Sequence, residues 1–171
     1  MPALMTHRYD PVVGSCRNVC SLPYDQALRV IDQLRRCLRP RLKPDYLEAR
    51  LTTEDWLIRD AGKALDRDLN HRPVYFFLGD FSWFADPSRP ATLLIALEDV
   101  EPDSMTFTLG DSMTIARKPD RRVYTLEEMI RSFIDAAPLA GFGFCDTGGP
   151  QAQFVEVQVW DKSAVIHAST I

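Results

Sequence analysis

The sequence predicts an α+β protein, in which N-terminal helices pack on a bent, mainly antiparallel sheet. Apolar residues recur at helical spacing in residues 24–38 and 45–69, whereas most strand-like segments follow residue 73. Segments 76–80 and 107–111 share the pattern Phe-x-Leu-Gly-Asp, an apolar strand that ends in a turn. Helices and strands are therefore segregated along the chain, which disfavours the regular alternation of a parallel βαβ fold.

The two long helical segments have recognisable ends. Pro23 suits the first turn of a helix over residues 24–38, and Pro40 ends that helix. In residues 45–69, a threonine pair followed by two acids at 52–55 resembles an N-terminal cap. Two helices are therefore expected to meet at that point.

The remaining elements are short and bounded by turn residues. Residues 92–97 form a continuous apolar run, which predicts a buried strand. Thr125 is expected to cap a last helix, with two acids in the first turn where the helix dipole favours them. A mobile, glycine-rich loop is expected over residues 138–152. The expected strands span residues 4–9, 74–78, 92–97, 105–109, 113–116, 123–124, 154–160 and 165–167.

The two Gly-Asp turns predict local geometry. Gly79 and Gly110 are expected to end or bulge their strands, because glycine readily adopts positive φ, while Leu78 and Leu109 are expected to be buried. The aspartate that follows each glycine either caps the turn or contributes to a cation site.

The composition is that of one globular domain spanning residues 1–171, with 46% apolar and 26% charged residues. The net charge of −4 disfavours a nucleic-acid-binding or membrane-binding surface. No signal peptide or membrane-length apolar segment is recognised, so a cytoplasmic location is expected. The four cysteines form no CxxC pair and are expected to be free thiols. No metal site is expected, because no second ligand pair follows Cys16 and Cys20 at zinc-site spacing.

The most informative candidate site is the strand that carries Glu156 and Gln158. If the intervening valines face the core, these two side chains lie together on the opposite face, flanked by Phe154 and Trp160. An acid beside an aromatic wall can have a raised pKa or bind a ribose hydroxyl. The alternative is a solvated strand face, on which Glu156 and Gln158 are ordinary surface residues.

This strand resembles the catalytic strand of the ADP-ribosyltransferase superfamily, where an acid lies two residues from an amide or second acid. That family opens with a strand that carries a His or Arg for the ribose of NAD, which His7 in Thr6-His7-Arg8-Tyr9 resembles. Its second conserved strand often carries a Tyr or Ser, and Tyr75 is similar. The order here is Glu-x-Gln, whereas the family usually has Gln/Glu-x-Glu.

The resemblance implies an NAD-dependent enzyme with a dinucleotide-binding cleft. Glu156 would stabilise the oxocarbenium-like ribose as nicotinamide leaves, Gln158 would orient the acceptor, and His7 and Tyr75 would hold the dinucleotide. Other segments resemble a family of bacterial proteins, a resemblance that implies neither an activity nor a protein partner. The alternative function is a non-catalytic α+β binding or interaction protein.

Overall fold

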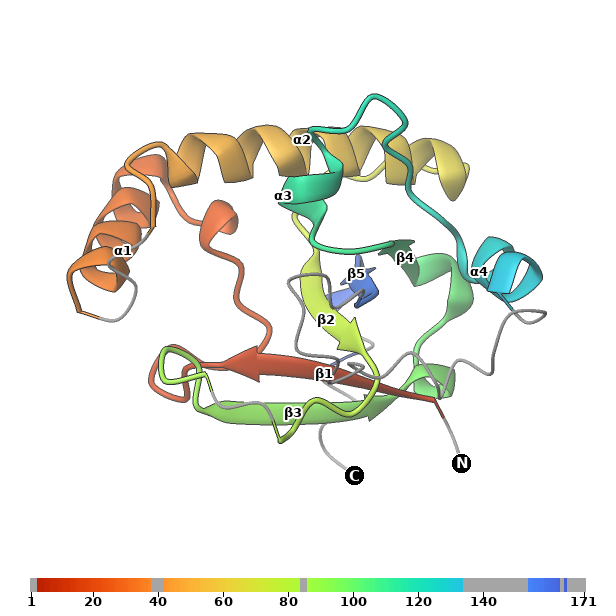
Figure 1. Ribbon diagram of the computed structural model, residues 1–171, viewed down its shortest axis with the longest axis horizontal. Coiled ribbons are helices and arrows are strands. Elements are labelled where there is room, and N and C mark those ends of the chain that lie inside the picture. The colour runs from red at the N-terminus through yellow and green to blue at the C-terminus, as the bar shows by residue number, and fades with distance from the viewer. Residues whose placement is uncertain (1–2, 38–41, 84–85, 134–153, 164, 166–171) are drawn as a thin grey trace.

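The computed structural model describes residues 3–37, 42–83, 86–133, 154–163 and 165 (Figure 1). Its strands are β1 (Leu4–Tyr9), β2 (Val74–Leu78), β3 (Ala91–Ala96), β4 (Met105–Thr108) and β5 (Glu156–Val159). The α-helices with described bounds are α1 (Tyr24–Cys37), α2 (Tyr46–Ala64), α3 (Ser112–Ile115) and α4 (Leu126–Phe133). Single 3₁₀ turns are η1 (Val19–Ser21), η2 (Leu97–Asp99) and η3 (Pro102–Ser104).

The strands form one five-stranded sheet in the order β3-β1-β2-β5-β4, and every neighbouring pair is antiparallel. The predicted α+β class is therefore confirmed. Helices are not confined to the N-terminal half, however, because α3 and α4 follow β4. The predicted bounds of β1 and β2 agree with the structure residue for residue.

The sheet is bent where β1 meets β2. β1 pairs with β3 along its whole length, but it pairs with β2 only at Met5 and Thr6. Beyond Thr6 the two strands separate, and Figure 1 shows β1 and β3 crossing steeply below β2. The separation leaves an opening inside the sheet, and the candidate site lies there.

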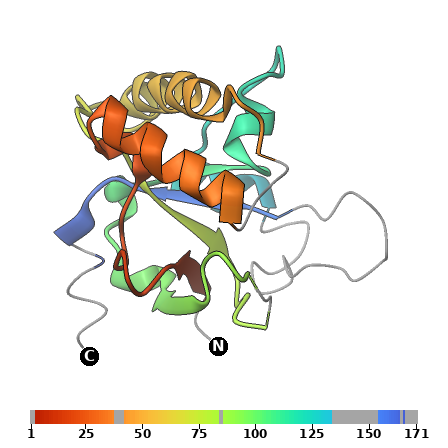
Figure 2. The same cartoon turned by 90° about the vertical axis from the view of Figure 1, so that its left-hand side faces the viewer.

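Helix α2 covers one face of the central strands, and α1 packs near its N-terminal end (Figures 1 and 2). Trp56, Leu57 and Ala61 of α2 pack in one cluster with Trp160, which is fully buried beyond the end of β5. Burial of a large apolar side chain stabilises a fold by roughly 1.5–3 kcal/mol. The face of β5 that carries Glu156 and Gln158 is therefore covered by a helix rather than solvated.

The predicted break in the second helical segment is wrong, because α2 is continuous through residues 52–55. The hydroxyls of Thr52 and Thr53 bond backward to the carbonyls of Glu48 and Ala49, one helical turn earlier. A threonine that bonds to the i−4 carbonyl sits inside a helix and caps nothing. Residues 65–69 lie beyond its end.

Four strand predictions need correction. β3 lies at the edge of the sheet and Leu94 is 41% exposed, so residues 92–97 are not a buried strand. Residues 113–116 belong mainly to α3 instead, because the Asp111 carboxylate accepts from Thr114 N–H and caps a helix. Tyr124 forms only an isolated bridge with Phe107. Val165 is helical, whereas Ile166, His167 and the expected loop over 138–152 lie outside the described residues.

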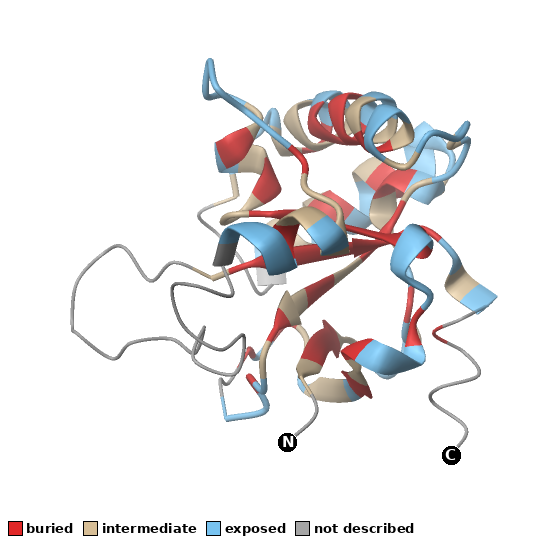
Figure 3. Cartoon of the chain, turned by 90° about the vertical axis from the view of Figure 1, so that its right-hand side faces the viewer, coloured by how far each residue is buried: buried red, intermediate tan, exposed pale blue. Residues whose placement is uncertain are grey.

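Most of the other local predictions are confirmed. Gly79 and Gly110 follow the ends of β2 and β4 with φ of 113° and 119°. Leu78 is fully buried as predicted. The predicted burial of Leu109 is wrong, because this side chain just after β4 is only partly buried. Thr125 caps α4 through its hydroxyl, which accepts from Glu128 N–H at 3.2 Å. Buried residues concentrate in the central strands and on the inner side of α2 (Figure 3).

Candidate functional site

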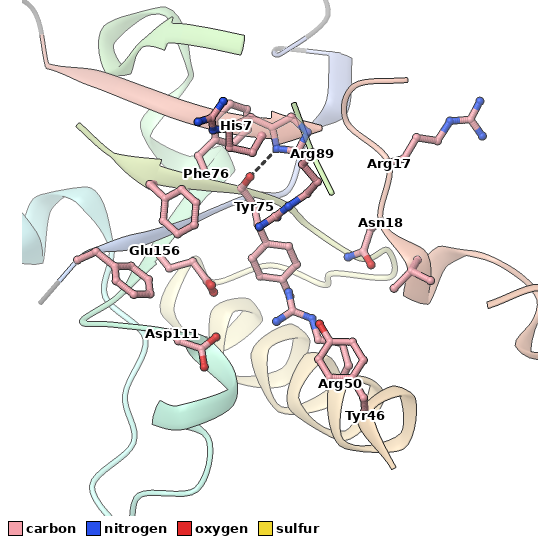
Figure 4. Close-up of a pocket in the computed structure, with 14 residues that line it drawn as sticks. His7, Arg17, Asn18, Tyr46, Arg50, Tyr75, Phe76, Arg89, Asp111 and Glu156 are labelled. Carbon is pink, nitrogen blue, oxygen red and sulfur yellow. Dashed lines mark hydrogen bonds between the residues drawn. The ribbon is translucent and has the colours of Figure 1, made fainter. Parts of the chain in front are cut away.

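A cavity of about 320 Å³ opens where β1 and β2 separate. This volume lies at the small end of the range of ligand sites, which is about 300–1,000 Å³. The walls come from β1, β2, β5, α2 and the loops that precede α1, β3 and α3 (Figure 4). The lining residues are His7, Arg8, Arg17, Asn18, Val19, Tyr46, Arg50, Tyr75, Phe76, Phe77, Arg89, Asp111, Phe154 and Glu156.

The cavity brings together three of the four residues singled out from the sequence. His7 comes from β1, Tyr75 from β2 and Glu156 from β5, and all three line its walls (Figure 4). These residues are separated by 68 or more positions along the chain, so only the sheet topology places them together.

His7 is held by main-chain groups at both ring nitrogens. Cys16 N–H donates to Nε2 at 3.2 Å, so Nδ1 carries the proton and donates to the Tyr75 carbonyl at 2.7 Å. Burial lowers the pKa of His7, and the nearby Arg89 charge acts in the same direction. The hydrogen bond to the Tyr75 carbonyl opposes both effects, because it raises the pKa of His7. His7 is thus a neutral ring that ties β2 to the loop after β1.

Glu156 is the buried acid of the cavity. It is 6% exposed, and burial raises the pKa of its carboxyl. The positive charge of Arg50 opposes this shift most strongly, and hydrogen bonds from Ser112 and Gln158 also lower the pKa. Asp111, which shares the cavity, raises it. Glu156 is therefore a carboxyl whose proton affinity depends on a neighbouring guanidinium.

Gln158 does not line the cavity. It is fully buried, and its amide accepts from Thr106 Oγ1 at 3.2 Å and donates to Thr108 Oγ1 at 3.1 Å. The same amide nitrogen donates to Glu156 Oε1 at 3.2 Å. The side chain expected to orient an acceptor therefore lies outside the cavity lining, and it is hydrogen-bonded to the Glu156 carboxyl instead.

Tyr75 is half-buried and is covered by Arg50 of α2. The Arg50 guanidinium carbon lies 4.0 Å from the centre of the Tyr75 ring. Burial raises the pKa of Tyr75 well above its usual range, against the charge of Arg50, which lowers it. For Arg50, burial alone would lower the pKa, but the interaction with Tyr75 and the charges of Glu156 and Glu54 outweigh burial and raise it.

Sequence reasoning missed Glu54, which holds this wall of the cavity together. Glu54 Oε1 accepts from Tyr75 Oη at 3.0 Å, from Asn18 Nδ2 at 3.0 Å and from Arg50 Nε at 3.2 Å. Its second oxygen lies 3.6 Å from Arg72 Nε. The only sequence signal is the i, i+4 spacing of Arg50 and Glu54, which is more typical of an exposed helix face.

The cavity is rich in positive charge. Four arginines line it, at positions 8, 17, 50 and 89, against two lining carboxylates, Asp111 and Glu156. Arg50 and Arg89 are also ion-paired, with Glu54 and Asp86. Arg8 forms no ion pair with the described carboxylates, so its charge favours a ligand that carries negative charge.

The two Gly-Asp turns do not form a cation site. Asp80 accepts from Ser82 N–H at 2.9 Å, and Asp111 caps α3, so both aspartates cap turns. Among the described residues, no group of three or more His, Cys, Asp or Glu side chains is placed to hold a metal ion. Cys16 and Cys20 are buried free thiols, and burial raises the pKa of Cys20 to about 12.

Comparison of the chain with family models, curated proteins and solved structures gives no match. No helix within the described ranges is both long enough and apolar enough to cross a membrane. The fold and the cavity define an α+β protein with an arginine-rich site around a buried acid.

Proposed function

We propose that this protein binds NAD in the cavity and transfers ADP-ribose to an acceptor, as an ADP-ribosyltransferase-like enzyme. The observation that carries the proposal is the convergence of His7, Tyr75 and Glu156 from three strands on one cavity. These are three of the four residues that the family resemblance selects, and at least 68 positions separate them in the sequence.

The environment of Glu156 supports a role in charge stabilisation. In this reaction the bond between the ribose and the nicotinamide of NAD breaks, and the nicotinamide ring keeps the electron pair. The acceptor then forms a bond to the ribose and releases a proton. A buried carboxylate stabilises a developing positive charge more strongly than an exposed one, because the surrounding dielectric is low. Arg50 favours the ionised form of Glu156 that this role needs.

The raised proton affinity of Glu156 supports a second use of the same carboxyl. A buried acid whose pKa lies above its usual value is a better base for the proton that the acceptor releases. Gln158 fixes the carboxyl by its 3.2 Å bond to Oε1. Gln158 thereby serves as a positioning residue in the proposal, and not as a contact to the acceptor.

His7 and Tyr75 form walls of the dinucleotide site in this proposal. Both nitrogens of His7 are engaged by main chain, so its ring contributes a surface and holds the opening between β1 and β2. Tyr75 contributes an aromatic face, on which the planar guanidinium of Arg50 now rests. An aromatic face that accepts one planar cation also suits the positively charged nicotinamide ring.

The test is a nicotinamide-release assay on the wild-type protein and on Glu156→Gln, with water and with panels of protein and nucleic-acid acceptors. The expected result is release by the wild type and a loss of roughly a hundredfold or more in the variant. Glu98→Gln, which changes an exposed acid in η2, is the matched control and should keep wild-type activity.

Two outcomes would contradict the proposal. If the wild type releases no nicotinamide with any acceptor, the protein is a non-catalytic binding protein. If the wild type and Glu156→Gln release nicotinamide equally, the acid that carries the reaction is a different residue.

A further inference from the structure

Arg8 is a buried cation without a counter-ion among the described residues. The residue is 7% exposed, and its Nη1 donates to the neutral hydroxyl of Thr92 at 2.6 Å. Its Nε is also buried and has no hydrogen-bond partner in the described part of the chain. None of the carboxylates described by the structure forms an ion pair with this side chain.

A buried cation without a counter-ion is unfavourable. Buried charges in folded proteins are normally paired, because removal of an ion from water costs several kcal/mol when no partner compensates. The neighbouring cavity offers a source of compensation, since Arg8 lies in its wall. An anion bound there would supply both the missing charge and an acceptor for Nε.

Two more arginines line the same cavity from different segments. Arg89, from the loop before β3, lies beside His7 and Tyr75 (Figure 4), and it forms an ion pair in which its Nε and Nη2 each lie 2.9 Å from Asp86 Oδ2. This ion pair leaves the N–H groups of Arg89 Nη1 for a ligand. Arg17, from the loop before α1, is exposed, and its guanidinium points away from the other labelled residues in Figure 4.

We propose that Arg8 and Arg89 form a binding subsite for a diphosphate group. Guanidinium groups match phosphate oxygens with paired hydrogen bonds, and two adjacent phosphates present enough oxygens for both side chains. The inference rests on the proposed function only in naming NAD as one carrier of this group. The shared chemistry is a diphosphate, either within a dinucleotide or as free pyrophosphate.

The first test uses inorganic pyrophosphate and calorimetric titration, so it does not depend on NAD chemistry. The wild type should bind pyrophosphate, and Arg8→Gln should weaken binding at least about tenfold, as expected for loss of a charged hydrogen-bonding group. Arg131→Gln is the matched control, because this arginine on α4 is 73% exposed and distant from the cavity lining. It removes the same charge and should leave the affinity unchanged.

Thermal unfolding gives a second readout. Without ligand, Arg8→Gln should melt at the same temperature as the wild type or higher, because an unpaired buried charge is removed. Pyrophosphate should raise the melting temperature of the wild type but not that of the variant. If Arg8→Gln does not fold, Arg8→Lys and Arg89→Gln provide the same comparison. Lysine keeps the charge but loses the guanidinium geometry.

The outcomes separate this inference from the proposed function. Absence of pyrophosphate binding by the wild type, or equal binding by the wild type and the folded Arg8 and Arg89 variants, would overturn the subsite. If ADP-ribose and pyrophosphate bind but nicotinamide is never released from NAD, the subsite stands and the proposed function fails. If NAD is cleaved and Arg8→Gln leaves its KM unchanged, the function stands and the subsite fails.

Discussion

The guanidinium of Arg50 lies 4.0 Å above the ring of Tyr75, and its Nε bonds the same Glu54 carboxylate that accepts from the Tyr75 hydroxyl. Helix α2 and strand β2 are therefore joined through one cation, one ring and one buried acid. A flat ligand that stacks on this face of Tyr75 must first displace Arg50.

Replacement of Arg50 is expected to affect both stability and acid chemistry. Arg50→Met should destabilise the protein by about 3 kcal/mol, because it removes a partner that is only 12% exposed from the buried Glu54 carboxylate. It should also raise the pKa of Glu156 further, since the Arg50 charge lowers that pKa in the wild type. The acidic limb of the pH profile for nicotinamide release should therefore move to higher pH.

Urea denaturation and the pH profile of release would measure these effects. Arg59→Met is the control, because Arg59 lies on the exposed side of the same helix, and it should change stability by only a few tenths of a kcal/mol. The double variant Arg50→Met/Glu54→Gln should recover part of the lost stability. A loss as small for Arg50→Met as for Arg59→Met would show that the pair contributes nothing.

Glu156→Gln is expected to change the pH dependence of stability. Burial raises the pKa of Glu156 above its usual 4.5, so the folded protein binds this proton more tightly than the unfolded chain does. Wild-type stability should therefore fall as pH rises from 4.5 through the folded-state pKa. The variant lacks this loss, so it should melt at or above the wild-type temperature at pH 8. The difference between the two melting temperatures should shrink as the pH is lowered. A difference that grows in acid would contradict the predicted direction of the pH dependence.

His7 is expected to act in the opposite direction. Burial lowers the pKa of His7 below its usual 6.5, so the unfolded chain takes up this proton more readily than the folded protein. The contribution of His7 to stability should be complete above pH 6.5 and should be lost as pH falls through the folded-state pKa. His7→Gln should lack this dependence. Melting curves between pH 5 and 8 that change equally in the two proteins would refute the prediction.

Gly110→Ala is expected to destabilise the protein through backbone strain alone. Gly110 has φ of 119°, and an added Cβ would be 3.8 Å from Ile115 Cδ1, an ordinary contact. The strain should cost about 1 kcal/mol or more, measurable by urea denaturation. A change of a few tenths would mean that the turn relaxes to a conformation that alanine tolerates.

Local pattern was sufficient for the elements whose ends depend on nearby residues. The Gly-Asp turn after β2 defines the end of that strand, and the cap at Thr125 defines the start of α4. Residues 113–116 were less clear from pattern, because a short apolar run suits a strand or a helix equally. The Asp111 cap decides in favour of α3.

The candidate site was only partly visible in the sequence, for a physical reason. His7, Tyr75 and Glu156 each lie on a strand that local pattern identifies, although their meeting depends on sheet order. Arg50 and Glu54 are spaced like a solvated ion pair, and only the packing of α2 on the sheet buries them. The burial of Gln158 also depends on that packing, which local sequence does not encode.

The early separation of β1 from β2 has a consequence for how the cavity is supported. Neighbouring strands are usually joined by a ladder of main-chain hydrogen bonds. Beyond Thr6 the imidazole of His7 provides such a link instead, because Nδ1 bonds to Tyr75 on β2 and Nε2 bonds to Cys16 in the loop after β1. The cavity therefore lies between two strands of the same sheet, and the side chain of His7 connects its two borders. Neither border can shift far without breaking one of the two bonds to that ring.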